Sequence, residues 1–471
     1  MNKKGLSTLV FGLLTLSLVL SACGTNQTNN AATPASDNGA KGDEAPVKEL
    51  RIMAGVVGGK TPEETELFEK EIERLTGIKV DINKPASDYD TKLTAAISSG
   101  EKYDLLQISK EKMNIFIEQG ILTPLTDFVE GSEVLSDIPS NEWEQVKTKD
   151  GQIYGVFSKF QGGTMPIVRQ DWLDKLKLKA PTTLDEFYTV LKAFKEQDPD
   201  GNGKADTYGL STAGLYEIQG FMSAAGLKQR YVMEGDKRVI PYATEAAVPV
   251  YEWFAKIYKE GILDPNFATN DSGKMRDLFL TDRVGMVTYW DAWVGLFNNT
   301  RLQEDPNTTF QAKGIPGPAG PDGTILLRRG DPDVWVIPVN AEHPETAKQF
   351  MDWWHTEPGI ILGSLGIEGE DYSVNDGKYE LTETGKDHGM DHGVPFWYNQ
   401  NVKPPFGNLP GVDDAQKIIV EHATVELTPP GWTDAEKILN NYAIKAMTGE
   451  MPAAEAVQKM HNELKAANLI D

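Results

Sequence analysis

Residues 198–206, Asp-Pro-Asp-Gly-Asn-Gly-Lys-Ala-Asp, place oxygen-bearing side chains at a spacing that suits a metal ion. Counted from the first residue, side-chain oxygens fall at positions one, three, five and nine, and position seven can offer its backbone carbonyl. A glycine at position six supplies the sharp turn that brings such groups round a hard cation. We therefore expect structural calcium here, held by Asp198, Asp200, Asn202, the Lys204 carbonyl and Asp206.

The match to a calcium-binding loop is incomplete at its far end. Position twelve is Gly209, where an EF-hand loop has a glutamate that closes the shell with two oxygens. Another oxygen would have to replace it, from Thr207, from water or from a distant residue. A metal-free turn is the alternative, because Asp, Asn and Gly form tight turns without a metal.

The sole cysteine, Cys23, follows an apolar run and two small residues. Lys3 and Lys4 precede the run Leu6–Leu20, which is the order of a secretory signal and is too short for a membrane span. The sequence Leu-Ser-Ala-Cys resembles the lipobox of bacterial lipoproteins, which implies cleavage after Ala22 and acylation, as with palmitate, of the Cys23 thiol. An ordinary signal peptide, with Cys23 incidental, is the alternative. Lipid chains would hold the mature protein on a membrane without spanning it.

Two other groups of side chains could carry chemistry. Glu368 and Asp371 form a carboxylate pair of the kind that glycosidases use. His388, Asp391 and His392 could hold a transition metal, although the glycines among them favour a turn. No nucleophile motif, zinc-binding helix or phosphate loop accompanies either group, so an enzyme is the weaker hypothesis.

The charge balance argues against several kinds of partner. The chain has 70 acidic and 46 basic residues, a formal charge of −24, and loss of Lys3 and Lys4 with the signal would change it by two, to −26. So acidic a surface disfavours nucleic acid and anionic lipid. With its one cysteine acylated, the mature chain has no disulfide, and its fold must depend on its core. A chain of 471 residues is long enough for two large lobes.

The first elements of the folded part follow a polar stretch, residues 23–46, whose composition predicts a flexible tether. Residues 49–53 and 78–82 alternate like strands. Between them, Thr61 and Glu64 form a capping box that starts a helix. This β-α-β order predicts a parallel, helix-covered sheet and an α/β fold. Further strands are expected at 103–109, 151–157 and 284–289, and a further helix at 184–195.

A series of short motifs runs through the chain after the tether. It starts with Tyr-Asp-Leu-Leu at 103–106, Gly-Ile-Leu-x-Pro-Leu at 120–125, Gly-Gln-Ile-Tyr-Gly-Val at 151–156 and Arg-x-Asp-Trp-Leu at 169–173. It continues with Pro-Thr-Thr-Leu-Asp-Glu-Phe at 181–187, Gly-Met at 285–286, Trp-Val-Ile-Pro at 335–338 and Met-Thr-Gly-Glu at 447–450. The ordered series resembles family 1 extracellular solute-binding proteins, which serve ABC importers, chiefly for sugars and oligosaccharides.

The resemblance implies a periplasmic-binding-protein-like α/β fold, with two lobes whose central sheets are covered by helices and joined by crossover hinge segments. By analogy with maltose-binding protein, the chain would cross near residues 158, 333 and 388. The N-lobe would then hold residues 47–158 and 334–387, and the C-lobe residues 159–333 and 388–471. Alginate-oligosaccharide-binding relatives have an EF-hand-like loop with structural calcium, which favours calcium at residues 198–206.

The resemblance also implies a ligand in the cleft between the lobes. Aromatic rings suit the C–H faces of a sugar, and charged side chains suit its hydroxyls. Each aromatic residue in the candidate set given below could instead be a packing residue. Trp353 and Trp354, inside an expected helix, are assigned to the core. Trp290, Trp397 and Tyr398 are the strongest ligand candidates. The full expected set is Arg169, Trp172, Trp290, Trp293, Trp335, Glu368, Tyr372, Trp397 and Tyr398.

The implied function is that of a monomeric, lipid-anchored binding protein on the extracellular face of the cell membrane. It would deliver a sugar or oligosaccharide to an ABC permease, without catalysis, and ligand would shift the lobes from open to closed. A surface glycosidase is one alternative. A ligand-sensing lipoprotein of a signalling system is another, and it would use the same fold.

Overall fold

A computed structural model describes residues 48–471 apart from 56, 59–60, 86, 149, 160–161, 216–217, 229–230, 236, 331, 389–406 and 426–430. The chain divides into two units, residues 1–46 and 47–471, and every helix and strand described below belongs to the second. The expected signal peptide, tether and acylated Cys23 lie outside the described residues.

The β-α-β unit expected at the start of the folded part is present. Strands β1 (Lys48–Met53) and β2 (Ile78–Asn83) pair in parallel, and α1 (Pro62–Thr76) connects them. The helix starts with a capping box, in which the Glu64 carboxylate accepts the Thr61 N–H at 2.9 Å and the Thr61 hydroxyl accepts the Glu64 N–H at 3.3 Å. The sequence prediction of this unit is confirmed.

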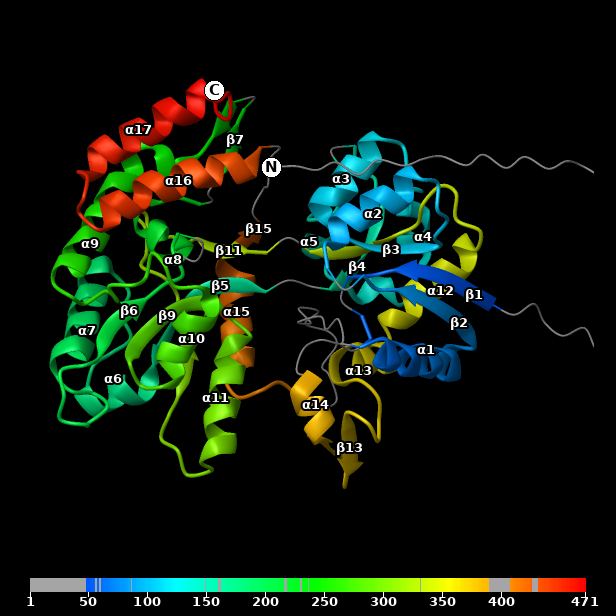
Figure 1. Cartoon of the computed structure of the whole chain (residues 1–471), viewed down its shortest axis with the longest axis horizontal. Helices are drawn as coiled ribbons and strands as arrows, with labels where there is room; N and C mark the ends of the chain where they lie inside the picture. The colour runs from blue at the N-terminus through cyan, green and yellow to red at the C-terminus, as the bar shows by residue number, and fades with distance from the viewer. Residues whose placement is uncertain are drawn as a thin grey trace, which may run out of the picture. The chain divides into compact units, whose positions relative to one another are not determined.

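A five-stranded sheet has the strand order β2-β1-β3-β12-β4 (Figure 1). Strand β3 (Leu105–Ser109) is parallel to β1, whereas β12 (Asp333–Val336) runs antiparallel to both β3 and β4 (Gly155–Lys159). A strand from far along the chain therefore separates β3 from β4. The elements around this sheet are α2 (Tyr89–Ser98), α3 (Lys110–Glu118), α4 (Thr126–Gly131), η1 (Leu135–Asp137), α5 (Ser140–Trp143), α12 (Pro344–Trp354), α13 (Glu357–Leu365) and α14 (Glu383–His388).

A six-stranded sheet forms from the middle and the end of the chain. Its order is β15-β11-β5-β9-β6, and β10 pairs antiparallel with β5. These strands are β5 (Gly163–Arg169), β6 (Tyr208–Ser211), β9 (Val284–Trp290), β10 (Ala312–Gly314), β11 (Leu327–Arg329) and β15 (Ala423–Val425). The helices of this part are α6 (Gln170–Leu176), α7 (Leu184–Glu196), α8 (Gln219–Met222), α9 (Val248–Lys259), α10 (Ser272–Leu280), α11 (Trp293–Glu304), α15 (Val412–His422), α16 (Trp432–Met447) and α17 (Ala453–Ala466), with short 3-10 helices η2 (Ser223–Ala225), η3 (Pro241–Ala243) and η4 (Glu245–Ala247).

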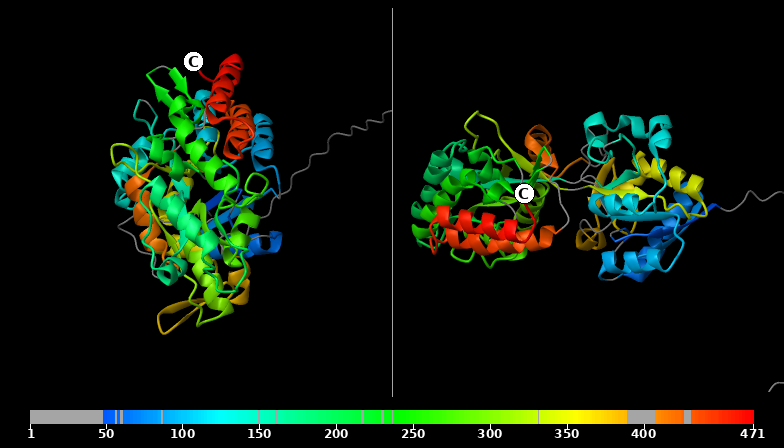
Figure 2. Two further views of the ribbon diagram at one scale, coloured as in Figure 1. Left: turned by 90° about the vertical axis from the view of Figure 1, so that its left-hand side faces the viewer. Right: turned by 90° about the horizontal axis from the view of Figure 1, so that it is seen from above.

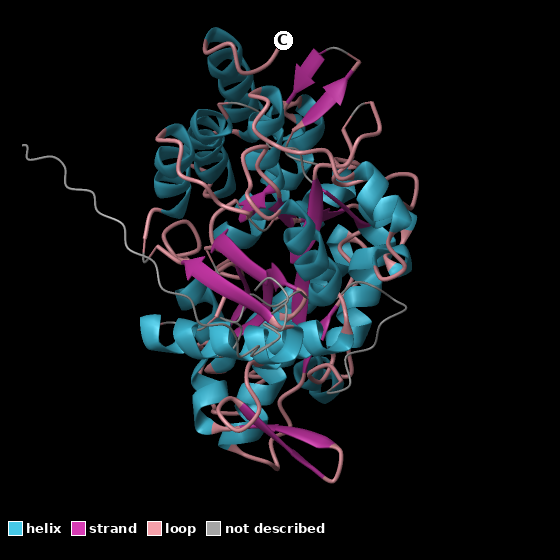
Figure 3. Ribbon diagram, turned by 90° about the vertical axis from the view of Figure 1, so that its right-hand side faces the viewer, coloured by secondary structure: helices cyan, strands magenta, loops and turns pink. Residues whose placement is uncertain are grey.

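Two hairpins and a terminal helix pair complete the described chain. One hairpin joins β7 (Val232–Glu234) to β8 (Lys237–Val239), and the other joins β13 (Tyr372–Asn375) to β14 (Lys378–Leu381). The second hairpin stands clear of the helices at the lower end of Figure 3. Helices α16 and α17 pack side by side at the C-terminus, as Figure 2 shows.

Two apolar cores hold the elements together. The first surrounds the five-stranded sheet and continues into β5 and β9 through residues such as Met165 and Val287. The second fills the space between α6, α7, α9, α16 and α17, and the rings of Trp172 and Phe194 pack edge to face in it at 5.5 Å. The first core therefore includes residues of both sheets.

Most of the expected strands and helices occur where the sequence places them. The strand expected at 151–157 is the exception, because β4 begins only at Gly155. The Thr148 N–H donates to the Gln152 carbonyl at 2.9 Å, which closes a turn and keeps the residues before Gly155 out of the sheet. Among the helices of the described residues, none combines the length and the apolar character that crossing a lipid bilayer requires.

Candidate functional site

Two short connections join the sheets and run side by side. The first leads from Lys159, the end of β4, to Gly163, the start of β5. The second leads from Arg329, the end of β11, to Asp333, the start of β12. The Gly330 N–H donates to the Gly162 carbonyl at 3.0 Å, so the two connections lie against each other. A change in how one sheet is held relative to the other would therefore move the side chains beside these connections.

Three side chains line up across β11, β5 and β9, at the end of the six-stranded sheet from which the connections leave. Thr164 on β5 is the cross-strand partner of Trp290 on β9 and of Arg328 on β11. Directly opposed residues of antiparallel strands project from the same face, so the three side chains form one row, called here the edge row. The Arg328 guanidinium carbon lies 5.5 Å from the centroid of the Trp290 ring. The edge row combines an aromatic face, a hydroxyl and a cation.

Trp290 is the member of the edge row that a ligand can reach, since Arg328 is only 7% exposed. Trp290 is only half-buried, which leaves part of its ring accessible. Thr164 is 1% exposed, and among the described residues its hydroxyl has no hydrogen-bond partner. An aromatic ring beside polar groups can stack on the apolar face of a ring compound and bond its hydroxyls. Sequence analysis predicted Trp290 but missed Thr164 and Arg328, although adjacent arginines in so acidic a chain were a usable signal.

Asp291 fixes the end of β9 that carries Trp290. It is fully buried, and its carboxylate accepts the Gly163 N–H at 3.2 Å while its own N–H donates to the Gly163 carbonyl at 3.0 Å. Trp293, also expected to bind ligand, is half-buried, with the Arg276 guanidinium 3.9 Å from its ring centroid. Trp293 therefore already has a cation against its ring.

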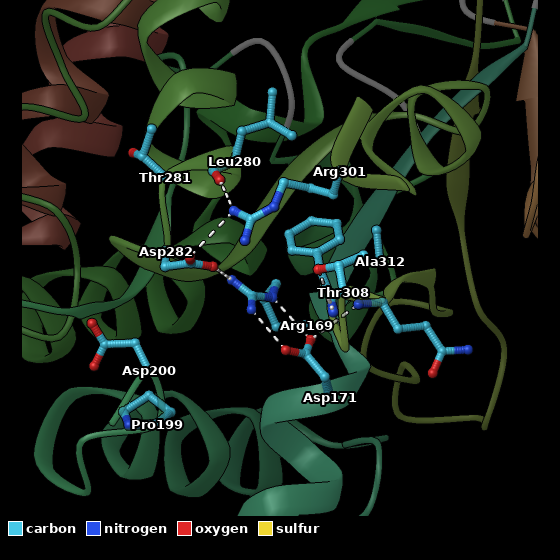
Figure 4. Close-up of polar contacts among 12 residues, drawn as sticks. Arg169, Asp171, Pro199, Asp200, Leu280, Thr281, Asp282, Arg301, Thr308 and Ala312 are labelled. Carbon is cyan, nitrogen blue, oxygen red and sulfur yellow. Dashed lines mark hydrogen bonds and ion pairs between the residues drawn. The ribbon is translucent and has the colours of Figure 1, made fainter. Parts of the chain in front are cut away.

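Arg169 and Trp172 are buried near the start of α6, and Figure 4 shows Arg169 beside Asp171 and Asp282. The Arg169 guanidinium bonds the Asp171 carboxylate at 2.9 and 2.7 Å and also pairs with Asp282. Its carbon lies 4.6 Å from the Trp172 ring centroid and 4.4 Å from that of Phe310. Both residues are thus engaged in packing and ion pairing and are not part of the edge row.

Trp335 is fully buried in β12, where the rings of Phe350 and Trp354 meet it edge to face at 5.8 Å each. In this arrangement it is a core residue. Trp354 is 1% exposed and donates from Nε1 to the Ser158 carbonyl at 3.0 Å, which confirms its assignment to the core. Trp353 is half-buried and packs on Phe350.

The turn between α13 and β13 separates the two carboxylates that could have formed a glycosidase pair. Glu368 is exposed, whereas Asp371 is 2% exposed and accepts hydrogen bonds from the Ile367 N–H at 2.7 Å and from His388 Nδ1 at 2.6 Å. Asp371 is therefore engaged within the fold. Tyr372 follows it, and burial raises the pKa of Tyr372 to about 12.

His388 is held between two carboxylates. Its Nε2 lies 3.1 Å from Glu64 Oε1, opposite the contact with Asp371. Burial lowers the pKa of His388, but the hydrogen bonds to Glu64 and Asp371 outweigh burial and raise the pKa above its ordinary value. This arrangement ties α14 to the first turn of α1. The predicted residues Asp391, His392, Trp397 and Tyr398 lie outside the described residues.

The loop expected to bind calcium lies between α7 and β6, as predicted. Asp198 adopts a left-handed backbone with φ 47°, and its Oδ1 is buried without a hydrogen-bond partner among the described residues. Burial, with a hydrogen bond and repulsion from Asp198, raises the pKa of Asp200. The Asn202 side-chain amide donates to both Asp200 and Asp206. Thr207 is turned inward, since its hydroxyl donates to the Phe194 carbonyl at 2.8 Å.

The chemistry of this loop suits a cation, because its carboxylates crowd together and disfavour one another's charge. Within the part of the chain that the structure describes, no three or more His, Cys, Asp or Glu side chains are arranged as a metal site. The Asn202 amide stands between the carboxylates that a cation would bridge, so the side chains would have to turn to bind one.

Residues 59–359 match the protein family described as bacterial extracellular solute-binding protein. The chain belongs to this family. Its relatives include lipoprotein LipO of Bacillus subtilis, which is 26% identical over 384 residues covering 78% of this chain and 74% of LipO. The polygalacturonan/rhamnogalacturonan-binding protein YtcQ of Bacillus subtilis is 28% identical, over 80% of this chain and 76% of YtcQ. The fructooligosaccharide ABC transporter substrate-binding protein FusA of Streptococcus pneumoniae is 32% identical, over 77% of this chain and 71% of FusA.

Solved structures show that this solute-binding protein has the fold of the family. Alginate-binding protein AlgQ2 without calcium ion superposes with a TM-score of 0.63 at 20% identity, covering 89% of this chain and 95% of AlgQ2. An EF-hand mutant of FusA in complex with fructo-nystose gives 0.57 at 18% identity, covering 89% of this chain and all of that one. The expected α/β, periplasmic-binding-protein-like fold is confirmed.

Proposed function

We propose that this solute-binding protein carries a sugar or oligosaccharide to an ABC permease and catalyses no reaction. The observation that carries the proposal is the edge row, where a half-buried Trp290 ring lies beside a buried hydroxyl and a guanidinium. Such a row suits the alternating apolar faces and hydroxyls of a sugar ring. The names of FusA and YtcQ, which state oligosaccharide and polysaccharide binding, support the same class of ligand.

The delivery mechanism we propose is hinge closure between two lobes. The first lobe would comprise residues 47–158 and 334–387, and the second residues 159–333 and 388–471. The two connections between the sheets, beside residues 159 and 330, support these limits. Ligand that contacts both lobes would favour the closed arrangement, and a permease that recognises this arrangement would receive only loaded protein.

A thermal-shift screen tests the proposed ligand class directly. Oligogalacturonides, kestose and maltose are offered to the protein, and positive results are confirmed by calorimetry and by chromatography of the recovered sugar. We expect at least one sugar to raise the melting temperature and to be recovered unchanged. Cleavage of the sugar would contradict the proposal, as would a lack of binding to every member of a wider oligosaccharide panel.

Substitution of Trp290 tests where the sugar binds. Trp290→Ala removes the stacking surface and is expected to weaken binding by about 5- to 150-fold, since aromatic stacking contributes on the order of 1–3 kcal/mol. Trp353→Ala is the matched control, because Trp353 is equally half-buried but belongs to α12. Equal affinity losses in the two variants would contradict the assignment of the edge row.

We also propose that the 198–206 loop binds calcium in a structural role. The residues that would hold the ion are Asp198, Asp200, Asn202, Asp206 and the carbonyl of Lys204. The buried Oδ1 of Asp198 supports this, because it has no hydrogen-bond partner within the described part of the chain. The raised pKa of Asp200 and the EF-hand named for the relative FusA also support it. Bound calcium would supply positive charge that balances the crowded carboxylates.

Melting temperatures with calcium and with chelator test the loop. We expect calcium to stabilise the natural protein and to leave Asp200→Ala unaffected. Asp322→Ala, in another exposed turn, is the control that should keep the calcium response. The same melting temperature with calcium and with chelator in the natural protein would contradict the metal site.

Anchoring through Cys23 on the extracellular side of the membrane is the last part of the proposal. The lipoprotein name of the relative LipO supports it. Membrane fractionation and mass spectrometry of the N-terminal peptide test it, with Cys23→Ser as the variant expected to leave the membrane fraction. Natural protein that is unacylated and free in the cytosol would contradict it.

A further inference from the structure

A buried ion pair joins elements of the two sheets. Arg329 Nη1 lies 2.9 Å from Glu142 Oε1, and the side chains are 6% and 3% exposed. Arg329 is the last residue of β11 in the six-stranded sheet. Glu142 belongs to α5, and its neighbour Trp143 packs against Phe157 of β4 at 5.2 Å between ring centroids. The pair therefore ties the six-stranded sheet to a helix that packs on the five-stranded sheet.

The environment of Glu142 holds its carboxylate in place. Its second oxygen accepts a hydrogen bond from Nε2 of Gln145, which follows α5 in the chain, at 2.7 Å. A buried carboxylate separated from its cation is strongly disfavoured, because the charge would be neither hydrated nor paired. Arg329 and Glu142 consequently resist separation more than an exposed pair would.

The pair is one residue away from the edge row. Arg329 is the cross-strand partner of Gly163, and Arg328 is the partner of Thr164. Successive residues of a strand project from opposite faces, so Arg329 reaches Glu142 while Arg328 remains beside Trp290. Because β11 moves as one strand, any shift of Arg329 relative to α5 also shifts Arg328.

We propose that the Glu142–Arg329 pair positions the edge row relative to the five-stranded sheet and thereby sets the distribution of lobe arrangements before ligand binds. Neither residue touches the ligand in this role; both act through β11. The consequence for ligand affinity rests on the proposed function, whereas the consequence for the ligand-free protein does not. The pair adjoins both the edge row and Gly330, which follows β11, so it lies where closure and binding can be coupled.

The experiment compares two carboxylate-to-amide substitutions in the full chain. Glu142→Gln removes the charge that pairs with Arg329 at almost unchanged volume. Asp264→Asn is the control, because Asp264 is 1% exposed but bonds Ser211, Asn266 and Asn270, all within the six-stranded part. Both variants are expected to lower the melting temperature. This measurement alone therefore does not distinguish a positioning role of Glu142 from a contribution to stability only.

The distance between the two sheets distinguishes the positioning role from a contribution to stability only. With Cys23→Ser, the sequence has no other cysteine, so Leu67→Cys on α1 and Leu302→Cys on α11 introduce two dye sites at residues 44% and 40% exposed. Single-molecule energy transfer without ligand should give a shifted or broader distance distribution in Glu142→Gln and an unchanged one in Asp264→Asn. A distribution in Glu142→Gln equal to that of the natural protein would overturn the proposal.

The affinity measurement uses the sugar that gives the largest thermal shift among oligogalacturonides, kestose and maltose. Glu142→Gln is expected to weaken its binding by about 2- to 30-fold, the range of couplings carried by residues that do not touch ligand. Asp264→Asn should bind as the natural protein does. Equal affinities in Glu142→Gln and the natural protein would overturn the coupling. If no sugar binds any variant, the proposed function fails, and the distance distribution still decides the positioning role.

Discussion

Replacing Arg169 with alanine is expected to be among the most destabilising single changes in the six-stranded part. The substitution removes a cation that is 3% exposed and that pairs with Asp171 and Asp282. It also empties the space between the rings of Trp172 and Phe310, which lie 4.6 and 4.4 Å from the guanidinium carbon. Two carboxylates would then lose a partner, and one of them, Asp171, has little access to water.

The size of the effect follows from the exposure of those carboxylates. Removing one member of a buried ion pair costs about 3–5 kcal/mol of unfolding free energy. Asp171 is 14% exposed and Asp282 is 32% exposed, and Asp282 keeps its contact with Arg301 at 3.2 Å. Water and Arg301 therefore compensate in part, which places the expected loss near the lower limit, at about 3 kcal/mol.

Urea unfolding, followed by tryptophan fluorescence and by circular dichroism, measures the loss. Arg301→Ala is the matched control, since Arg301 binds the same Asp282 but is 22% exposed, and its removal should cost about 1 kcal/mol. Arg169→Lys keeps a charge without the fork geometry and should fall between the two. A cost below about 1 kcal/mol for Arg169→Ala, or equal costs for Arg169→Ala and Arg301→Ala, would refute the reasoning from burial.

Two further changes test other contacts. His388→Gln should destabilise the protein most below about pH 6.5, the pKa of an unfolded histidine. The difference in unfolding free energy from the natural protein should shrink as the pH rises through the higher folded pKa of His388. A difference that grows with pH would contradict the raised pKa. Gly285→Ala would place a Cβ 2.2 Å from Phe194 Cδ2 and should cost about 1–3 kcal/mol in urea unfolding, whereas Gly131→Ala, with no atom within 4 Å, should be almost neutral.

Local sequence signals predicted the elements well where several of them agreed. The first helix illustrates this, since a capping box at Thr61 and Glu64 marks its start and Gly77, at φ 68°, marks its end. The strand expected at 151–157 starts too early, since β4 begins at Gly155. Thr148 and Gln152 close a turn before it, a contact that the residue types alone do not reveal.

The candidate site was harder to predict, because burial is decided by packing between distant segments. Trp290 and Trp335 both occur in strands, yet Trp335 is enclosed by α12 while Trp290, the last residue of β9, is only half-buried. Arginine is a common ligand-binding residue type, which made Arg169 a candidate. Its carboxylate partner Asp282, however, lies 113 residues further along the chain, where no local pattern reveals it. Thr164 became a candidate only through its register with Trp290, which no local pattern in the sequence encodes.

The central place of β12 has a consequence for biosynthesis. Residues 333–336 fill the gap between β3 and β4, which are complete by residue 159. A nascent chain that has not yet reached residue 333 consequently leaves two strand edges open, and such edges invite pairing with other chains. The long stretch of chain between β4 and β12 also means that the sheet forms slowly, because segments distant in the sequence must meet. Until translation has passed residue 336, the five-stranded sheet cannot form completely. The unpaired edges of β3 and β4 would then be a defined target for holdase chaperones.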